Sequence, residues 1–251
     1  MSWSLTPGQF MCLWETTGLD RMPYPLRYRS PARTQNEYAE QQMRLARWRD
    51  GIDDPKLEAS IRALRNPDVS VTLYVPEVGN GPAIRRRMCL RGRVGVVADQ
   101  DDAATGFGTI TIDARGGHVR DTLDWMCRGL LAAIPSMHPG RTRSVSADPE
   151  ELGDAQPTVL QGAQASGAQL IRKIVSRRDG AGYLCVHGPR EGASEPLVDE
   201  LTWLDIADDG RYLYHRDHRV HLRAADTDAI RDALHSILVA ATSREPAPAA
   251  R

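Results

Sequence analysis

Residues 201–241 decide the fold, and they read LTWLDIADDGRYLYHRDHRVHLRAADTDAIRDALHSILVAA. Short turns rich in Asp and Gly divide the first part into three apolar-rich runs, which predict strands at 201–207, 211–216 and 219–223. Asp226 or Thr227 then caps a helix. One face of that helix is apolar, because Ile230, Leu234, Ile237, Leu238 and Ala241 recur at the 3.6-residue period.

The same order of elements occurs earlier in the chain. Alternating apolar and polar residues predict strands at 69–75, 84–90, 93–98 and 108–113. A helix closes this block, and its apolar face carries Val119, Leu123, Met126, Leu130, Leu131 and Ile134. A strand at 183–187 gives the later block its fourth strand. Two interpretations stay open: a structural duplication in which both blocks join one antiparallel sheet, or two ordinary meanders in one chain.

Composition limits the class of protein. The hydrophobic fraction of 41% is enough for a core, and the net charge of -1 gives no overall field that favours nucleic acid or membrane. The cysteines have no CxxC spacing and lie in apolar contexts, which indicates buried free thiols in a reducing compartment: Cys12, Cys89, Cys127 and Cys185. Residues 1–10 lack a secretory signal, and no apolar run approaches the roughly 18 residues of a membrane helix. We therefore expect a cytoplasmic protein without membrane insertion.

The N-terminal third is predicted to be helical. Capping boxes that start at Thr6 and Thr34 open two helices, and Asp54 followed by Pro55 opens a third. Between the first two, prolines at 23, 25 and 31 forbid a regular helix, so this segment is expected to lie extended across a hydrophobic surface. The loops at 76–82 and 189–196 are expected to be flexible.

No catalytic or metal motif stands out. The chain contains no GxSxG, HExxH, GxxxxGK[ST] or GxGxxG pattern. His215, His218 and His221 are evenly spaced, but on strands the first two point to opposite faces, and no cysteine or carboxylate stands at ligand spacing. We interpret them as surface histidines of a hairpin, and we predict no metal and no cofactor.

The charged runs do not indicate nucleic-acid binding or acid–base catalysis. Arg86 points away from Arg85 and Arg87 on a strand, so this basic patch is small. The acidic run Asp99, Asp101 and Asp102 is typical of a solvated loop. We therefore predict no catalytic residue and no nucleic-acid partner.

A partner-binding site is predicted on the second block, beside a helix expected from 157 to about 177. Small residues in the middle of that helix leave a shallow trough, and strand 211–216 carries tyrosines on one face and Leu213 on the other. Trp203 on the next strand would wall the trough. The predicted partner-binding residues are Gly162, Ser166, Gly167, Trp203, Tyr212 and Tyr214. The competing interpretation is that all of them pack inside the protein. Binding there would depend on apolar burial and would survive raised salt.

Short motifs along the chain resemble the EspG family, the chaperones associated with ESX (type VII) secretion in actinobacteria. They extend from about Leu5 to Leu238, and their order and spacing carry the resemblance. The motifs are Trp14-Glu15, Gly18-Leu19-Asp20, Pro23-Tyr24-Pro25-Leu26, Pro67-Asp68-Val69, Gly140-Arg141, Ser144-Val145-Ser146, Gly210-Arg211-Tyr212-Leu213 and Val220-His221-Leu222.

The resemblance implies an α/β (α+β) fold with a central antiparallel sheet, flanking helical bundles and an internal pseudo-twofold. It implies one domain over 1–242, with halves of about 1–134 and 148–242, followed by a disordered tail at 243–251. It also implies a non-enzymatic cytosolic chaperone that binds the hydrophobic tip of a PPE, PE–PPE or WXG-type helical substrate and keeps it soluble for secretion. A weak homodimer is left open. The alternative is an enzyme or small-ligand-binding α/β protein without a recognisable motif.

Overall fold

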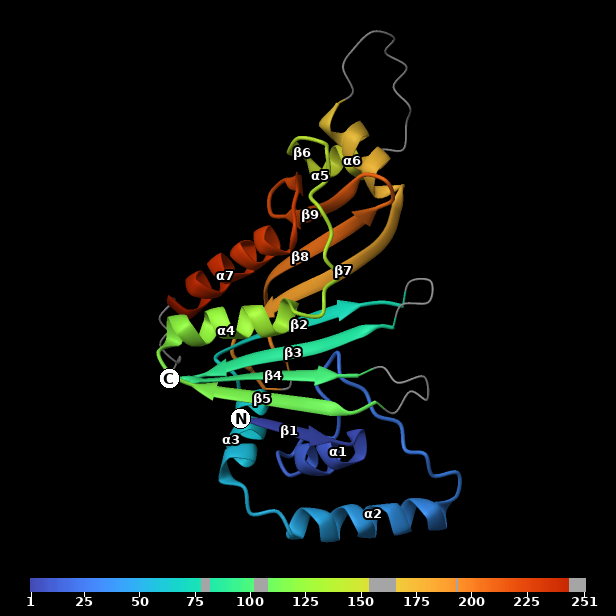
Figure 1. Cartoon of the computed structure of the whole chain (residues 1–251), viewed down its shortest axis with the longest axis vertical. Helices are drawn as coiled ribbons and strands as arrows, with labels where there is room; N and C mark the ends of the chain where they lie inside the picture. Colours follow the sequence, from blue (N-terminus) through green and yellow to red (C-terminus); the bar gives the residue numbers. More distant parts are fainter. Residues whose placement is uncertain (78–81, 102–107, 154–165, 193, 244–251) are drawn as a thin grey trace.

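The computed structural model describes residues 1–77, 82–101, 108–153, 166–192 and 194–243. A 10-stranded sheet, antiparallel at every strand pair, runs along the length of the molecule (Figure 1). Its strands are β1 (Ser2–Leu5), β2 (Val69–Val75), β3 (Ile84–Arg91), β4 (Val94–Gln100), β5 (Ile110–Gly116), β6 (Val145–Ala147), β7 (Arg178–His187), β8 (Leu197–Ile206), β9 (Gly210–Arg216) and β10 (Val220–Ala224). The prediction of one continuous antiparallel sheet is confirmed, and each block forms a meander within it.

The strand order is the same on both sides of the centre. β2 and β7 pair at the middle, with Tyr74 opposite Tyr183. Outward from that pair, β3, β4, β5 and β1 follow on one side, and β8, β9, β10 and β6 follow on the other. The edge strands β1 and β6 were not predicted, because four and three residues are too few to show an alternation. The division into halves at 1–134 and 148–242 stays a prediction.

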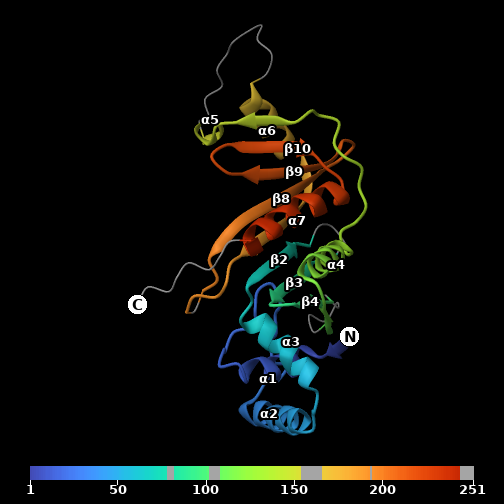
Figure 2. The same ribbon diagram turned by 90° about the vertical axis from the view of Figure 1, so that its left-hand side faces the viewer.

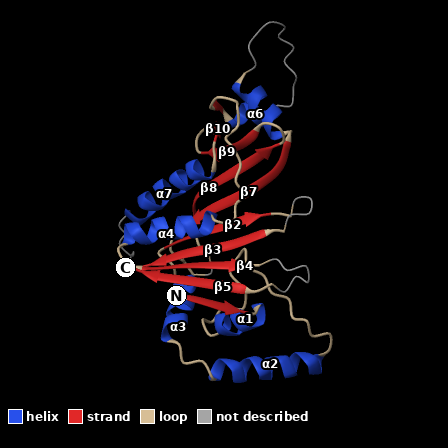
Figure 3. Ribbon diagram, viewed as in Figure 1, coloured by secondary structure: helices blue, strands red, loops and turns tan. Residues whose placement is uncertain are grey.

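Two helices cover one face of the sheet centre. α4 (Val119–Leu131) and α7 (Thr227–Ser243) lie side by side over the middle strands (Figures 1 and 3). Asp226 caps α7 by accepting a hydrogen bond from the Ala229 backbone N–H at 2.8 Å. Their apolar faces pack on alternate residues of β2, β3, β7 and β8, and the central members of this core are Val71, Leu73, Leu123, Leu130, Leu184, Leu234 and Leu238.

The opposite face of the first half is covered by three helices, α1 (Pro7–Glu15), α2 (Gln35–Asp50) and α3 (Pro55–Arg65). Both predicted capping boxes are present, at Thr6 and Thr34. Phe10 and Trp14 of α1 are fully buried against the sheet, whereas α2 packs on α1 and buries no residue completely.

The second half has a smaller cover on that same face. α5 (Pro149–Gly153) and α6 (Gly167–Val175) lie at the end of the molecule opposite α1, α2 and α3 (Figure 2). Of the helix expected from 157 to about 177, the described part is α6, which begins at Gly167, because Ser166 is its N-cap and accepts a hydrogen bond from the Gln169 backbone N–H at 3.2 Å. Residues 154–165 and the tail 244–251 lie outside the described residues. All four cysteines are free, and Cys12, Cys89 and Cys127 are buried as predicted, whereas Cys185 is half-buried.

Candidate functional site

Between the two helical covers, no helix of the described part of the chain lies over one stretch of the sheet face opposite α4 and α7, and we call this stretch uncovered. A row of side chains crosses it from strand to strand, because the ladder registers place Tyr74 of β2, Tyr183 of β7, Thr202 of β8 and Tyr214 of β9 side by side. Tyr183 is 38% exposed, and Tyr74 and Tyr214 are half-buried. Alternation along each strand aims this row away from the α4–α7 core. The sheet therefore presents aromatic rings to solvent at the junction of its halves.

Tyr24 extends the row on the side of the first half. Its ring lies 6.0 Å from the Tyr74 ring, centroid to centroid, and it is 60% exposed. The Arg85 guanidinium lies 5.6 Å from the centre of the Tyr74 ring, within reach of a cation–π interaction. Partial burial raises the pKa of the Tyr24 phenol, and Tyr74 adds to the shift. We call Tyr24, Tyr74, Tyr183 and Tyr214 the tyrosine face.

A hollow of about 650 Å³ continues the tyrosine face toward α6. We call it the α6 groove. Its floor is the sheet, and one wall is the helix. The residues that line it are Leu152, Ile171, Arg172, Val175, Ser176, Arg178, Ala181, Tyr183, Thr202, Leu204 and Tyr214. Most of the lining surface is apolar, and arginine and hydroxyl groups are set into it, which is the composition of a site that buries an apolar partner.

The described residues of the predicted trough do not stand in the middle of a helix. Ser166 and Gly167 stand at the start of α6, and a Cβ on Gly167 would lie 2.4 Å from the Ser146 carbonyl oxygen of β6. Gly167 therefore allows close packing of α6 on β6 inside the protein. Gly162 lies outside the described residues.

Two further predicted residues are buried. Trp203 is 2% exposed and faces α7, on the opposite side of the sheet from Tyr214, because it alternates with Thr202 and Leu204 along β8. The expectation that it walls the same hollow is wrong. Tyr212 is 0% exposed, and its hydroxyl donates to Asp209 Oδ2 at 2.9 Å. Of the six predicted residues, Tyr214 alone lines the α6 groove among those described.

The sequence reasoning missed Tyr24, Tyr74 and Tyr183. A signal was present, since Tyr74 alternates with the apolar residues of β2 and Tyr24 lies in the proline-rich segment expected to cross a hydrophobic surface. What was missing was the register. Only the pairing of β2 with β7, and of β7 with β8, brings these rings into one row.

Comparison with known proteins assigns the family. The model of the EspG family matches residues 6–236. The chain belongs to the EspG family. A solved structure of the Mycobacterium tuberculosis type VII secretion system chaperone EspG5, in complex with the PE25–PPE41 dimer, has the same fold. The TM-score is 0.63 at 15% sequence identity, over 95% of this chain and 96% of that chain. No curated protein sequence matches the chain.

In this EspG chain, the far end of the uncovered face is closed by the loop between β7 and β8. Glu195 of that loop is buried and accepts hydrogen bonds from Arg87 Nη2 at 2.6 Å and from Ser70 Oγ at 2.8 Å. Arg190 of the same loop also donates to it. Burial favours a higher pKa for Glu195, but Arg87 and the hydrogen bonds outweigh it and hold the pKa below its usual value. A segment expected to be flexible is therefore anchored across the two halves.

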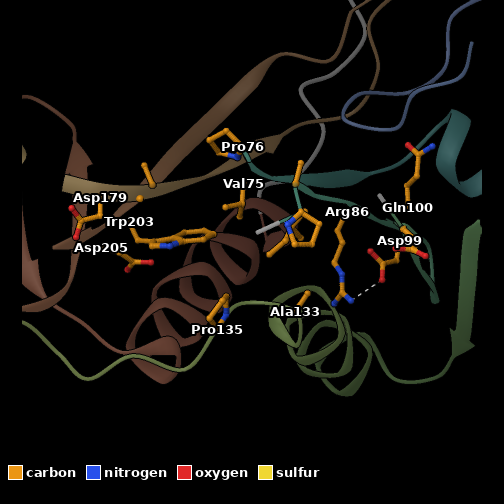
Figure 4. A pocket seen from close by; sticks show the side chains of 16 residues that line it. Val75, Pro76, Arg86, Asp99, Gln100, Ala133, Pro135, Asp179, Trp203 and Asp205 are labelled. Carbon is orange, nitrogen blue, oxygen red and sulfur yellow. Dashed lines mark hydrogen bonds and ion pairs between the residues drawn. The ribbon is translucent and has the colours of Figure 1, made fainter. Parts of the chain in front are cut away.

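A second hollow, of about 590 Å³, lies on the α4–α7 face where β2 ends (Figure 4). Arg86 pairs there with Asp99 at 2.7 Å and also donates to the Gly129 carbonyl at the end of α4. Asp205 holds Arg211 through two hydrogen bonds. No His, Cys, Ser or Lys stands among the described residues that line it.

The histidines lie on the β9–β10 hairpin. His215 Nε2 lies 2.9 Å from Asp199 Oδ1, and His221 Nδ1 lies 2.8 Å from Ser146 Oγ. Within the described ranges, no group of three His, Cys, Asp or Glu side chains is placed to hold a metal ion. Among the same residues, no helix has the length and apolar character to cross a bilayer.

Proposed function

We propose that this chain is a chaperone of a type VII (ESX) secretion system that binds a PE–PPE-type helical substrate before export. One observation carries the proposal: an uncovered row of tyrosines runs into an apolar groove on the EspG fold. The solved relative with this fold is a type VII chaperone in complex with a PE25–PPE41 dimer. The complex would form in the cytosol and would keep an apolar part of the substrate out of water.

The chemistry of the surface supports protein binding over catalysis. Tyrosine contributes a large rigid ring and a polar tip, so it buries apolar area while its hydroxyl still finds a partner. Cys185, which faces the same side as Tyr183, has a pKa raised by burial, so its thiol stays protonated and unreactive. We infer that the substrate lies on the tyrosine face, with one segment in the α6 groove.

Site-specific crosslinking tests this proposal. p-Benzoylphenylalanine would replace Tyr183 or Tyr214 in the full chain, produced in the cell that encodes it. Tyr38 is the matched control, because it is a tyrosine, 47% exposed, on α2 at the other end of the molecule. Photolysis at 183 and 214 should trap a helical substrate of type VII secretion that mass spectrometry identifies, and photolysis at 38 should not. The proposal would be overturned if neither position 183 nor position 214 trapped such a substrate. It would also be overturned if position 38 gave an equal crosslinking yield.

A further inference from the structure

The polar groups that line the α6 groove are guanidinium and hydroxyl groups. Two guanidinium groups line it, those of Arg172 and Arg178, together with the hydroxyls of Ser176, Tyr183, Thr202 and Tyr214. No carboxylate belongs to its described lining. Arg172 has an interaction of its own, so Arg178 is the cationic group of the groove that we consider for a ligand.

Arg178 is held in place. Its Nη1 donates to the Val175 carbonyl oxygen at 3.1 Å, at the C-terminal end of α6. A guanidinium has five N–H donors in a fixed plane, so the bond to Val175 leaves others for a ligand. The tyrosine hydroxyls of 183 and 214 have no hydrogen-bond partner within the described residues. Asp179 and Glu200 lie near in sequence to lining residues, but neither lines the groove.

These polar groups limit which substrate segments can bind in the groove without a cost in free energy. A purely apolar segment would cover Arg178 and the tyrosine hydroxyls without giving them acceptors, and burying unpaired polar groups is costly. A segment with Lys or Arg would bring like charge against Arg178. A carboxylate beside an apolar side chain satisfies both requirements, since charge-assisted hydrogen bonds to guanidinium groups are strong and directional.

We propose that the segment of the substrate that enters the α6 groove is an apolar turn or helix end flanked by at least one Asp or Glu. This rests on the proposed function. The apolar side chain packs on Ile171, Val175 and Leu204. The carboxylate accepts from Arg178 and from a tyrosine hydroxyl at the mouth of the groove. The charge therefore selects among apolar partners, and the apolar floor gives most of the buried area.

The test uses the crosslinking chain with p-benzoylphenylalanine at 214. Peptide mapping of the trapped product should place an Asp or Glu within about four residues of the crosslinked apolar residue, which is one helical turn. Arg178→Glu in that background should lower the crosslinking yield by about tenfold or more, and Arg178→Gln by less. Arg177→Glu is the matched control, because Arg177 is exposed next to Arg178 and does not line the groove. Circular dichroism melts would show that all variants are folded.

The outcomes separate the two proposals. A trapped substrate segment that has no Asp or Glu beside the crosslink would overturn the carboxylate inference while the proposed function stands. Equal loss of yield in Arg178→Glu and Arg177→Glu would also overturn it, because the effect would then belong to overall charge. Failure to trap any type VII substrate at 183 and 214 would overturn the proposed function itself.

Discussion

The two halves of the sheet share one strand plan but carry different helical covers. In the first half, α1 and α3 pack over β1, β3 and β4, and Phe10, Trp14 and Leu64 have no exposed surface. In the second half, α6 has 9 residues and leaves Tyr183 and Tyr214 partly exposed. The difference teaches that the accessible surface arises from a short cover rather than from unusual strands. Substitutions in the two covers should therefore differ in what they damage.

The largest loss of stability is expected in the helical cover of the first half. Trp14→Ala removes a fully buried side chain whose Nε1 also donates to the Arg21 carbonyl at 2.7 Å, so the free energy of unfolding should fall by about 3–5 kcal/mol. Tyr183→Ala, at the short cover, should change it by less than about 1 kcal/mol, because Tyr183 is already partly exposed. Urea unfolding followed by fluorescence measures both. Similar losses in the two variants would contradict the contrast between the covers.

The ion pair that joins the halves should give the next effect. Arg87→Met leaves the buried Glu195 carboxylate without its main partner, which should cost about 3–5 kcal/mol. The double change Arg87→Met with Glu195→Met replaces the pair by apolar groups and should recover most of the loss. Arg86→Met, which breaks the more exposed pair with Asp99 on the other face, is the control and should cost less. A double variant as unstable as Arg87→Met would show that the loop is held in another way.

A smaller loss is expected at the start of α6. Gly167→Ala places a Cβ 2.4 Å from the Ser146 carbonyl oxygen, so α6 must move away from β6 at a cost of about 1–3 kcal/mol. Gly153→Ala serves as control, because a Cβ there meets no atom within 4 Å. Thermal melts of the two variants compare them. If the Gly167→Ala and Gly153→Ala variants had equal melting temperatures, the packing of α6 on β6 would be looser than described.

Acid should weaken the link between the halves gradually. The folded pKa of Glu195 lies below its usual 4.5, so its contribution is complete above about pH 4.5 and is lost as the pH falls through the lowered folded value. The pKa of His187 is lowered from 6.5 by burial and then by Arg87, which makes protonation destabilising as the pH falls below about 6.5. Urea midpoints between about pH 7 and pH 3 should fall less steeply in the Arg87→Met, Glu195→Met double variant than in the parent. Parallel curves would assign the acid sensitivity to other groups.

Local pattern sufficed to predict most elements, but not the surface they form. β2 matches the expected range 69–75, and α4 and α7 follow the expected apolar periodicity, because burial on one face leaves a period in the sequence. Gly167 was misread because a small residue in a helical pattern and a small residue at a helix start look alike without the neighbouring strand. The row of tyrosines depends on register between strands far apart in sequence, which no local window contains.

The row across β2, β7, β8 and β9 also sets a time order during synthesis. Tyr74 leaves the ribosome well before Tyr183 and Tyr214, and until β7 emerges the edge of β2 that faces it has no hydrogen-bonding partner. A nascent chain therefore contains every residue of the first cover long before it contains all the strands of the row. A partner that needs the whole row would find it only when nearly the whole polypeptide has been made.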